Sequence, residues 1–242
     1  MRQIRIYQPG AYENKDLLPL SASASHHVKS VLRMQEGEHL VLFPGDNREF
    51  EAVISRIQGK IVHVCVGQER YVNRESSLCI HLAQGISKGD RMEMVIQKAV
   101  ELGVQSITPL ITERAVVKLN QERMERKLAQ WQAMVIAACE QSGRNQLPQV
   151  NPILQLSEYL QRPLTPLKFV LHPNTQKTWR HYQHQAQALT VLIGPEGGFS
   201  EEEINQIVAQ HFEPLTLGPR VLRTETAAIT TLGVLQAVWG DL

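Results

Sequence analysis

The sequence predicts an α/β protein of two domains, in which a small β domain precedes a mostly parallel sheet covered by helices on both sides. Three features of the 242-residue chain lead to this prediction. Short apolar strands separated by glycine turns fill the chain to about residue 71. Strands and helices alternate after residue 77, and two glycine-rich turns near the C-terminus each stand between a strand and a helix. A chain of this length can give each domain a core.

The composition limits the class of protein. The chain is 43% hydrophobic, and its formal net charge of +1 argues against a protein that coats nucleic acid through bulk charge. The three cysteines are far apart and form no Cys-x-x-Cys pair, so we expect a reducing compartment, no disulfide framework and no metal site. The first residues lack the apolar run of a signal peptide, and no stretch is apolar enough to span a bilayer. We therefore expect a cytoplasmic protein.

The first domain is predicted to be a small barrel or meander, because its apolar segments are short and separated by turn residues. Its expected strands are residues 4–7, 40–43, 50–57 and 61–66. One helix is expected at about 25–34, where apolar residues recur at helical spacing. The polar segment 69–77 has no periodicity, so we expect domains at residues 1–71 and 72–242.

The second domain is predicted to contain a parallel sheet, because apolar strands alternate with amphipathic helices. Its expected strands are residues 78–86, 107–110, 168–171, 190–193 and 215–217, with a helix after each of the last three. Its other expected helices are residues 89–102 and 121–141, and the final helix is expected at 225–239.

The first glycine-rich turn reads GPEGGFS over residues 194–200. Ser200 is placed to cap the following helix, and Glu203 to complete a capping box. Glu196 and the acidic start of the helix oppose a pyrophosphate, which binds best at a helix N-terminus free of anions. This turn therefore favours a neutral, zwitterionic or cationic ligand, and S-adenosylmethionine with its sulfonium fits that description.

The second glycine-rich turn reads LGPRVLRTETA over residues 217–227. Two strand–turn–helix units in succession favour a ligand site, because glycines let bare backbone approach a ligand. Arg220 and Arg223 are candidate functional cations, although they are also placed to pair with Glu225 or another acid.

Together these stretches resemble the 16S ribosomal RNA (uracil-N3)-methyltransferase family of the SPOUT class. Further matching stretches are KGDRM at 88–92, QKAVELGV at 97–104, TERAV at 112–116 and AACEQSGR at 137–144, with segments 2–7 and 27–33 near the N-terminus. The resemblance covers nearly the whole chain. It implies a PUA-like β-barrel, a methyltransferase domain with a C-terminal trefoil knot, and a homodimer. It also implies the methylation of one uridine at N3 in 16S ribosomal RNA, with S-adenosylmethionine as the donor.

The resemblance also implies roles for individual residues. Three segments would hold the donor, and the expected residues are Leu171, His172, Pro173, Ile193, Gly194, Pro195, Glu196, Gly197, Gly198, Leu217, Gly218, Val221, Leu222, Thr226 and Ala227. Arg223 and Arg220 would stabilise charge on the uracil oxygens, and Glu225 or Glu196 would accept the N3 proton. RNA contacts are expected from basic residues of both domains, namely Arg2, Arg5, Lys29, Arg33, Arg114 and Arg144.

Two alternatives remain open at this point. The same donor site can serve methylation of another RNA base or of a ribose 2′-hydroxyl. A chain with this sequence can also be a non-catalytic RNA-binding factor of ribosome assembly with a vestigial site.

Overall fold

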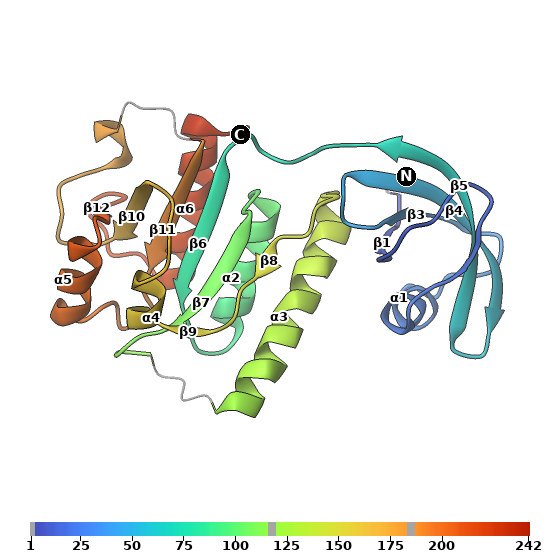
Figure 1. Cartoon of the computed structure of the whole chain (residues 1–242), viewed down its shortest axis with the longest axis horizontal. Helices are drawn as coiled ribbons and strands as arrows, with labels where there is room; N and C mark the ends of the chain where they lie inside the picture. Colours follow the sequence, from blue (N-terminus) through green and yellow to red (C-terminus); the bar gives the residue numbers. More distant parts are fainter. Residues whose placement is uncertain (1–2, 116–119, 183–186) are drawn as a thin grey trace. The chain divides into compact units, whose positions relative to one another are not determined.

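The computed structural model describes residues 3–115, 120–182 and 187–242, which form two units (Figure 1). The first unit contains Met1–Glu75 and Cys139–Leu147, and the second contains Ser76–Ala138 and Pro148–Leu242. The sequence pattern did not indicate that Cys139–Leu147 groups with the first unit. Contacts between segments this far apart in the chain decide that grouping, and local periodicity does not encode them.

The first unit is built on a five-stranded sheet in the order β1-β3-β4-β5-β2. The strands are β1 (Arg5–Tyr7), β2 (Leu17–Pro19), β3 (His39–Phe43), β4 (Arg48–Gln58) and β5 (Ile61–Tyr71). The pairing of β1 with β3 is parallel, and the other pairings are antiparallel. Alternate residues of β4, namely Phe50, Ala52 and Ile54, face the core and are buried.

A short helical segment covers this core. It consists of α1 (Ala22–His26), capped by the Ser21 side chain, and the π-helix η1 (His27–Val31). The helix predicted at 25–34 thus exists but starts and ends earlier in the chain. Ser21 accepts the Ala24 amide and so fixes the start at a cap that the apolar spacing did not reveal.

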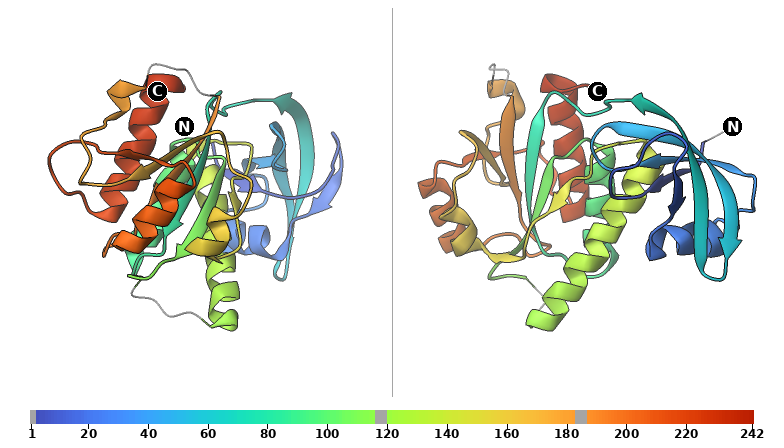
Figure 2. Two further views of the ribbon diagram at one scale, coloured as in Figure 1. Left: turned by 60° about the vertical axis from the view of Figure 1, so that its left-hand side comes forward. Right: turned by 45° about the vertical axis from the view of Figure 1, so that its right-hand side comes forward.

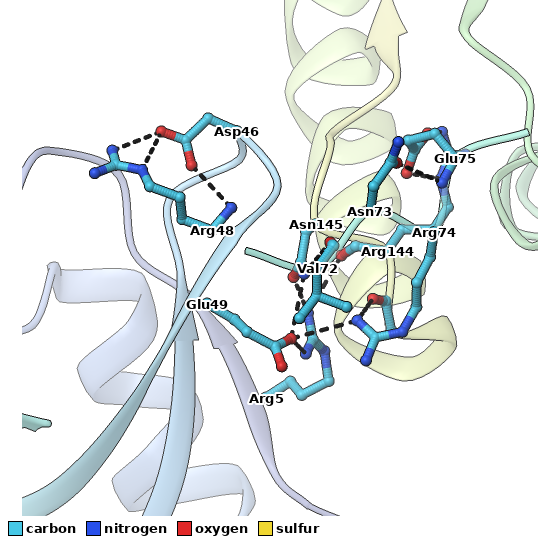
Figure 3. Close-up of polar contacts among 11 residues, drawn as sticks. Arg5, Asp46, Arg48, Glu49, Val72, Asn73, Arg74, Glu75, Arg144 and Asn145 are labelled. Carbon is cyan, nitrogen blue, oxygen red and sulfur yellow. Dashed lines mark hydrogen bonds and ion pairs between the residues drawn. The ribbon is translucent and has the colours of Figure 1, made fainter. Parts of the chain in front are cut away.

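A buried polar cluster joins the segment Cys139–Leu147 to the sheet of the first unit (Figure 3). Glu49 on β4 accepts hydrogen bonds from Arg5 at 2.7 Å, from Asn145 at 3.2 Å and from Arg74 at 3.3 Å. Burial alone would raise the pKa of the Glu49 carboxyl. The three donors lower it by more than burial raises it, so the pKa lies below its ordinary value. The carboxylate therefore stays ionised while it anchors the segment.

The second unit is built on a seven-stranded sheet in the order β12-β10-β11-β6-β7-β8, with β9 also paired to β7. The strands are β6 (Cys79–Gly85), β7 (Ser106–Ile111), β8 (Gln149–Val150), β9 (Leu154–Gln155), β10 (Leu167–Leu171), β11 (Ala188–Ile193) and β12 (Glu213–Leu215). The described pairings are all parallel, which confirms the predicted sheet.

Helices cover both faces of this sheet (Figure 2). They are α2 (Asp90–Glu101), α3 (Gln121–Ser142), α4 (Leu156–Leu160), α5 (Glu201–Ala209) and α6 (Thr224–Trp239). Val170 of β10 belongs to the core beneath Ile207 of α5, whereas the neighbouring Phe169 stacks on Trp239 of α6. Successive strand residues point to opposite faces, so α5 and α6 lie on opposite sides.

The connection after β10 differs from the prediction. A helix was expected there, but within residues 172–182 the structure has only the short 3-10 turn η2 (Trp179–His181). The prediction was wrong because it took strand–helix alternation as a rule for every strand. The backbone instead returns close to the sheet, where the His172 amide donates to the Leu215 carbonyl and the Thr216 amide to the Lys177 carbonyl.

The strand order reverses between β6 and β11, because the chain leaves β6 toward β7 and later returns to the other side of β6. In open parallel sheets, ligands bind at the carboxyl ends of the strands next to such a reversal. Both glycine-rich turns lie at the carboxyl ends, after β11 and β12.

Candidate active site

A cavity of about 630 Å³ opens at the carboxyl ends of β10, β11 and β12. Its apolar lining includes residues from strand ends and from the second glycine turn, among them Leu171, Ile193, Leu215, Leu217, Val221 and Leu222. Charged side chains also line it, namely Arg91, Arg114, Glu196, Arg220, Arg223 and Glu225. An apolar pocket with a few charged groups is typical of a site for an organic ligand.

The first glycine turn is packed closely against strand β6. A Cβ built on Gly85 would lie 2.5 Å from Cδ of Pro195, so only glycine permits this approach. Gly198 has a φ of +67°, and a Cβ there would meet nothing within 4 Å. The turn is closed by the Gly198 amide, which donates to the Pro195 carbonyl at 2.9 Å. Its backbone thus lines the cavity without side chains that would obstruct a ligand.

Glu196 holds this turn to the start of α2. Its Oε1 accepts the Lys88 amide at 2.9 Å and the Arg91 guanidinium at 2.8 Å. Burial raises the pKa of the Glu196 carboxyl, but its own amide, Arg91 and the Lys88 amide more than reverse this, and the net pKa is lowered. A carboxylate with a lowered pKa that is already bound to a cation is a weaker base, so Glu196 suits the role of a clamp better than that of a proton acceptor.

The predicted capping box at the start of α5 is confirmed. Ser200 Oγ accepts the Glu203 amide at 3.2 Å, and Glu203 Oε2 accepts the Ser200 amide at 3.0 Å. Glu203 is buried, and its Oε1 also accepts the Glu113 amide at 2.8 Å. The next residue, Arg114, donates to the Gly197 carbonyl at 3.3 Å. One capping residue therefore also fixes the loop after β7 beside the glycine turn.

The second glycine turn leads into α6 and presents its cations to the cavity. Arg220 and Arg223 are exposed, and within the described residues neither has an ion-pair partner. The described side chains of Arg220 and Arg223 thus form no ion pair with Glu225, which was the alternative to a functional role. Glu225 Oε2 is buried and has no hydrogen-bond partner among the described residues. Two guanidiniums and one carboxylate oxygen that have no partner in the described part of the chain therefore share a single cavity.

Nearly all the residues predicted to hold a donor line this cavity. The exceptions are Gly218 and Thr226, which do not reach it. The candidate catalytic residues Arg220, Arg223 and Glu225 all line it. The structure thus brings three segments that are distant in sequence to one place, and their individual roles stay predictions.

The predicted RNA-binding residues divide into separate groups. Arg2 lies outside the described residues. Arg114 lines the cavity of the second unit, whereas Lys29 and Arg33 are exposed and line a separate cavity of about 430 Å³ in the first unit.

Two of the predicted RNA contacts do not fit their places in the structure. The side chain of Arg5 is only 10% exposed and pairs with Glu49, and that of Arg144 is 5% exposed and pairs with Glu75. A phosphate cannot replace these carboxylates without leaving a buried charge unpaired. Arg5 and Arg144 therefore belong to the internal cluster of the first unit, and their burial does not support the predicted contacts with RNA.

Sequence reasoning missed several residues of the site. Arg91 was quoted only as part of a matching stretch, and its pairing with Glu196 spans 105 residues of sequence. Gln84 and Thr224 were given no role, yet they are buried and hydrogen-bonded to each other behind the glycine turn. The sequence signals for this contact were Gly85, which follows Gln84, and the second glycine-rich turn, which contains Thr224.

Within the part of the chain that the structure describes, no group of three or more His, Cys, Asp and Glu side chains is arranged to hold a metal ion.

A search of the described helices found none with the length and apolar character needed to cross a membrane.

Comparisons with known proteins agree on one family. The sequence model of the RNA methyltransferase domain matches residues 74–236, and that of the RNA methyltransferase PUA domain matches residues 20–64. Ribosomal RNA small subunit methyltransferase E of Buchnera aphidicola (Schizaphis graminum) is 37% identical over 98% of this chain and 97% of its own. The protein of that name from Bacillus subtilis is 30% identical over 92% of this chain and 91% of its own.

Solved structures are also similar over the whole chain. A Legionella pneumophila methyltransferase in complex with the cofactor S-adenosylmethionine has 56% identity and a TM-score of 0.98, with both chains fully covered. Ribosomal RNA small subunit methyltransferase E of Neisseria gonorrhoeae, also bound to S-adenosylmethionine, has 36% identity and a TM-score of 0.91, again with both chains fully covered.

Proposed function

This chain belongs to the ribosomal RNA small subunit methyltransferase E family, and from that membership we propose that it transfers a methyl group from S-adenosylmethionine to N3 of one uridine in 16S ribosomal RNA. The observation that carries the proposal is the convergence of two glycine-rich turns, two arginines and one carboxylate oxygen on a single cavity, where these three charged groups have no partner among the residues that the structure describes.

The residues of this cavity fit the donor. The space next to Gly198 is open, and the first turn lines the cavity. A ligand can therefore contact the backbone of this turn directly. The strand-end residues around Leu171, the first turn 193–198 and the second turn 217–222 would hold it, with Leu171, Ile193 and Leu222 against its apolar parts. S-adenosylmethionine supplies a methyl group that its sulfonium already activates. The protein therefore has to orient the donor and exclude water rather than activate it.

The acceptor requires more assistance from the chain. N3 of uracil carries a proton and lies on the pairing edge, so the base has to leave its helix, which costs on the order of a few kcal/mol. Loss of the proton places negative charge on O2 and O4, and Arg223 or Arg220 would stabilise that charge. These guanidiniums have no competing carboxylate among the described residues.

Glu225 is the better candidate for the proton acceptor. Its Oε2 has no described partner, whereas Glu196 is engaged by Arg91 and has a lowered pKa. A group that accepts a proton needs a free oxygen within reach of its substrate. Glu225 lies in the first turn of α6, two residues after Arg223, and both residues line the cavity, which supports this pairing of base and cation.

The RNA would be held by local basic surfaces, because the net charge of +1 offers no bulk attraction. Arg114 in the second unit and Lys29 with Arg33 in the first are the described candidates. We retain residues 1–71 as the RNA-binding part and 72–242 as the methyl-transferring part. The proposal also includes the C-terminal trefoil knot, a homodimer and a cytoplasmic location, as the resemblance implies.

The test is methylation of small-subunit ribosomal RNA that lacks the modification, with labelled S-adenosylmethionine and identification of the product nucleoside by mass spectrometry. We expect 3-methyluridine at one position, and donor binding detectable by calorimetry. Methylation of another base or of a 2′-hydroxyl would contradict the assignment of N3. Absence of donor binding, with and without RNA, would instead favour the non-catalytic assembly factor.

A further inference from the structure

Gln84 and Thr224 form a buried connection at the wall of the cavity. Gln84 is the penultimate residue of β6 and is fully buried, and Thr224 begins α6 and is 6% exposed. The Gln84 Nε2 donates to Oγ1 of Thr224 at 3.0 Å and to the Gly85 carbonyl at 3.0 Å, and it lies 3.4 Å from the Gly194 carbonyl. The Thr224 hydroxyl in turn donates to the Gly194 carbonyl at 2.7 Å.

These contacts join three pieces of backbone that form the cavity. Gly194 begins the first glycine turn, Gly85 packs against Pro195 of that turn, and Thr224 stands directly between Arg223 and Glu225. Because the Thr224 hydroxyl accepts from Gln84 and donates to Gly194, its orientation is fixed from both sides. The separation of the first turn from the start of α6 is therefore set by two side chains, of which Thr224 also belongs to the lining of the cavity.

We propose that Gln84 and Thr224 are positioning residues for methyl transfer, which fix the first glycine turn at the correct distance from Arg223 and Glu225. The inference rests on the proposed function of the cavity. Each turn keeps its own local geometry without this connection, because Gly198 closes the first turn on Pro195 and α6 continues from its own backbone bonds. What the connection supplies is the alignment of the two turns with each other.

Alignment and folding are affected differently by the loss of this connection. If Thr224 served only to satisfy a buried group, its removal would lower the unfolding temperature and leave methyl transfer by the folded protein unchanged. If it aligns the turns, the rate of the chemical step falls while the affinities for donor and RNA stay nearly constant. A displacement of about 1 Å can lower a rate by about 100-fold.

The matched variants are Thr224→Val and Thr231→Val. Thr231 lies in the same helix, is buried to 1% exposure and donates to the Ala227 carbonyl at 2.7 Å, but it makes no described hydrogen bond to the glycine turn. The measurements are the single-turnover methylation rate at saturating donor and RNA, the donor Kd by calorimetry, the RNA Kd by filter binding, and the unfolding temperature.

We expect Thr224→Val to lower the single-turnover rate by about 10- to 100-fold with less than a threefold change in either Kd. Thr224→Ser, which keeps the hydroxyl, should restore the rate to within about threefold of the wild type, and Thr231→Val should leave it unchanged. An unchanged rate in Thr224→Val, or a donor Kd that rises as much as the rate falls, would overturn the proposal.

Gln84→Met removes the amide donor, keeps the length of the side chain and provides a second test if Thr224→Val does not fold. It should also lower the rate by about 10-fold with nearly constant Kd values. If neither variant folds, the pair belongs to the core and the proposal is wrong. A wild-type chain that neither binds donor nor methylates RNA would contradict the proposed function itself, and this outcome is distinct from any variant result.

Discussion

Glu203 accepts the backbone amide of Glu113 through Oε1 at 2.8 Å, while its Oε2 completes the capping box of α5. One buried carboxylate thus joins the loop after β7 to the helix that follows the first glycine turn. Because Arg114 next to Glu113 reaches the Gly197 carbonyl, this relationship also determines one wall of the cavity.

Glu203→Ala should destabilise the protein by about 1–3 kcal/mol, because it removes a helix cap and leaves the Glu113 amide without its acceptor. Urea unfolding followed by circular dichroism measures the change. Glu202→Ala, at an exposed position of the same helical turn, is the control and should change stability by less than about 0.5 kcal/mol. Equal losses in the two variants would show that the contacts of Glu203 contribute little.

Gly85→Ala should lower donor affinity at least about 10-fold, because the added Cβ would lie 2.5 Å from Pro195 Cδ and displace the first glycine turn. Calorimetry with S-adenosylmethionine measures the effect. Gly233→Ala, where a Cβ would meet nothing within 4 Å, is the control and should bind the donor like the wild type. Normal affinity in Gly85→Ala would mean that the turn does not contact the donor.

Arg223→Ala should lower the turnover number by about 100- to 1000-fold and change donor affinity much less, because its charge is needed only when the uracil becomes anionic. Steady-state kinetics and calorimetry separate the two quantities. Arg126→Ala removes an exposed arginine that pairs within α3 with Glu122, and it should be near neutral. Equal losses of turnover and donor affinity in Arg223→Ala would indicate a structural role.

The ion pair of Glu196 with Arg91 should persist at neutral pH and weaken only as the pH falls below 4.5, the ordinary pKa of a glutamate. The folded-state pKa of Glu196 is below the ordinary value of 4.5, so its contribution to stability is complete above 4.5 and is lost as pH falls through the lowered value. Carbon-13 NMR of the Glu196 carboxyl measures this pKa directly.

Arg91→Met should raise the pKa of Glu196, since Arg91 is one of the groups that lower it. A pKa of Glu196 at or above 4.5 in the wild type would contradict the conclusion that Glu196 is bound as a carboxylate by Arg91.

Arg5→Ala should destabilise the first unit by about 3–5 kcal/mol, because it leaves Glu49 buried without its nearest cation. RNA affinity of the folded protein should be unchanged.

The double variant Lys29→Ala and Arg33→Ala should show the reverse pattern, with normal stability and weaker RNA binding. The slope of log affinity against log salt concentration should fall by about one for each lost phosphate contact. Binding at several salt concentrations, together with thermal unfolding, measures both; loss of RNA affinity in folded Arg5→Ala would restore its predicted role.

The sequence alone determined the features that depend on neighbouring residues. The capping box of Ser200 and Glu203, the final helix and the glycine turns are set by residues a few positions apart, so local physical chemistry predicts them. The alternation of strands and helices in the second unit predicted the parallel sheet, and the order of motifs along the chain indicated the family. Of the residues that were expected from these signals to hold the donor, all but Gly218 and Thr226 line the cavity.

Only the tertiary structure decided which distant residues meet. Arg91 and Glu196 are 105 residues apart, and Gln84 and Thr224 are 140 apart, so their contacts depend on strand order rather than on local pattern. The same reason explains why the burial of Arg5 was not predicted, since a basic residue near a chain end resembles a surface group until its buried carboxylate partner is known. Local sequence specifies where chains turn, cap and bury apolar faces, whereas side-chain pairing is fixed by the packing of segments that the sequence keeps far apart.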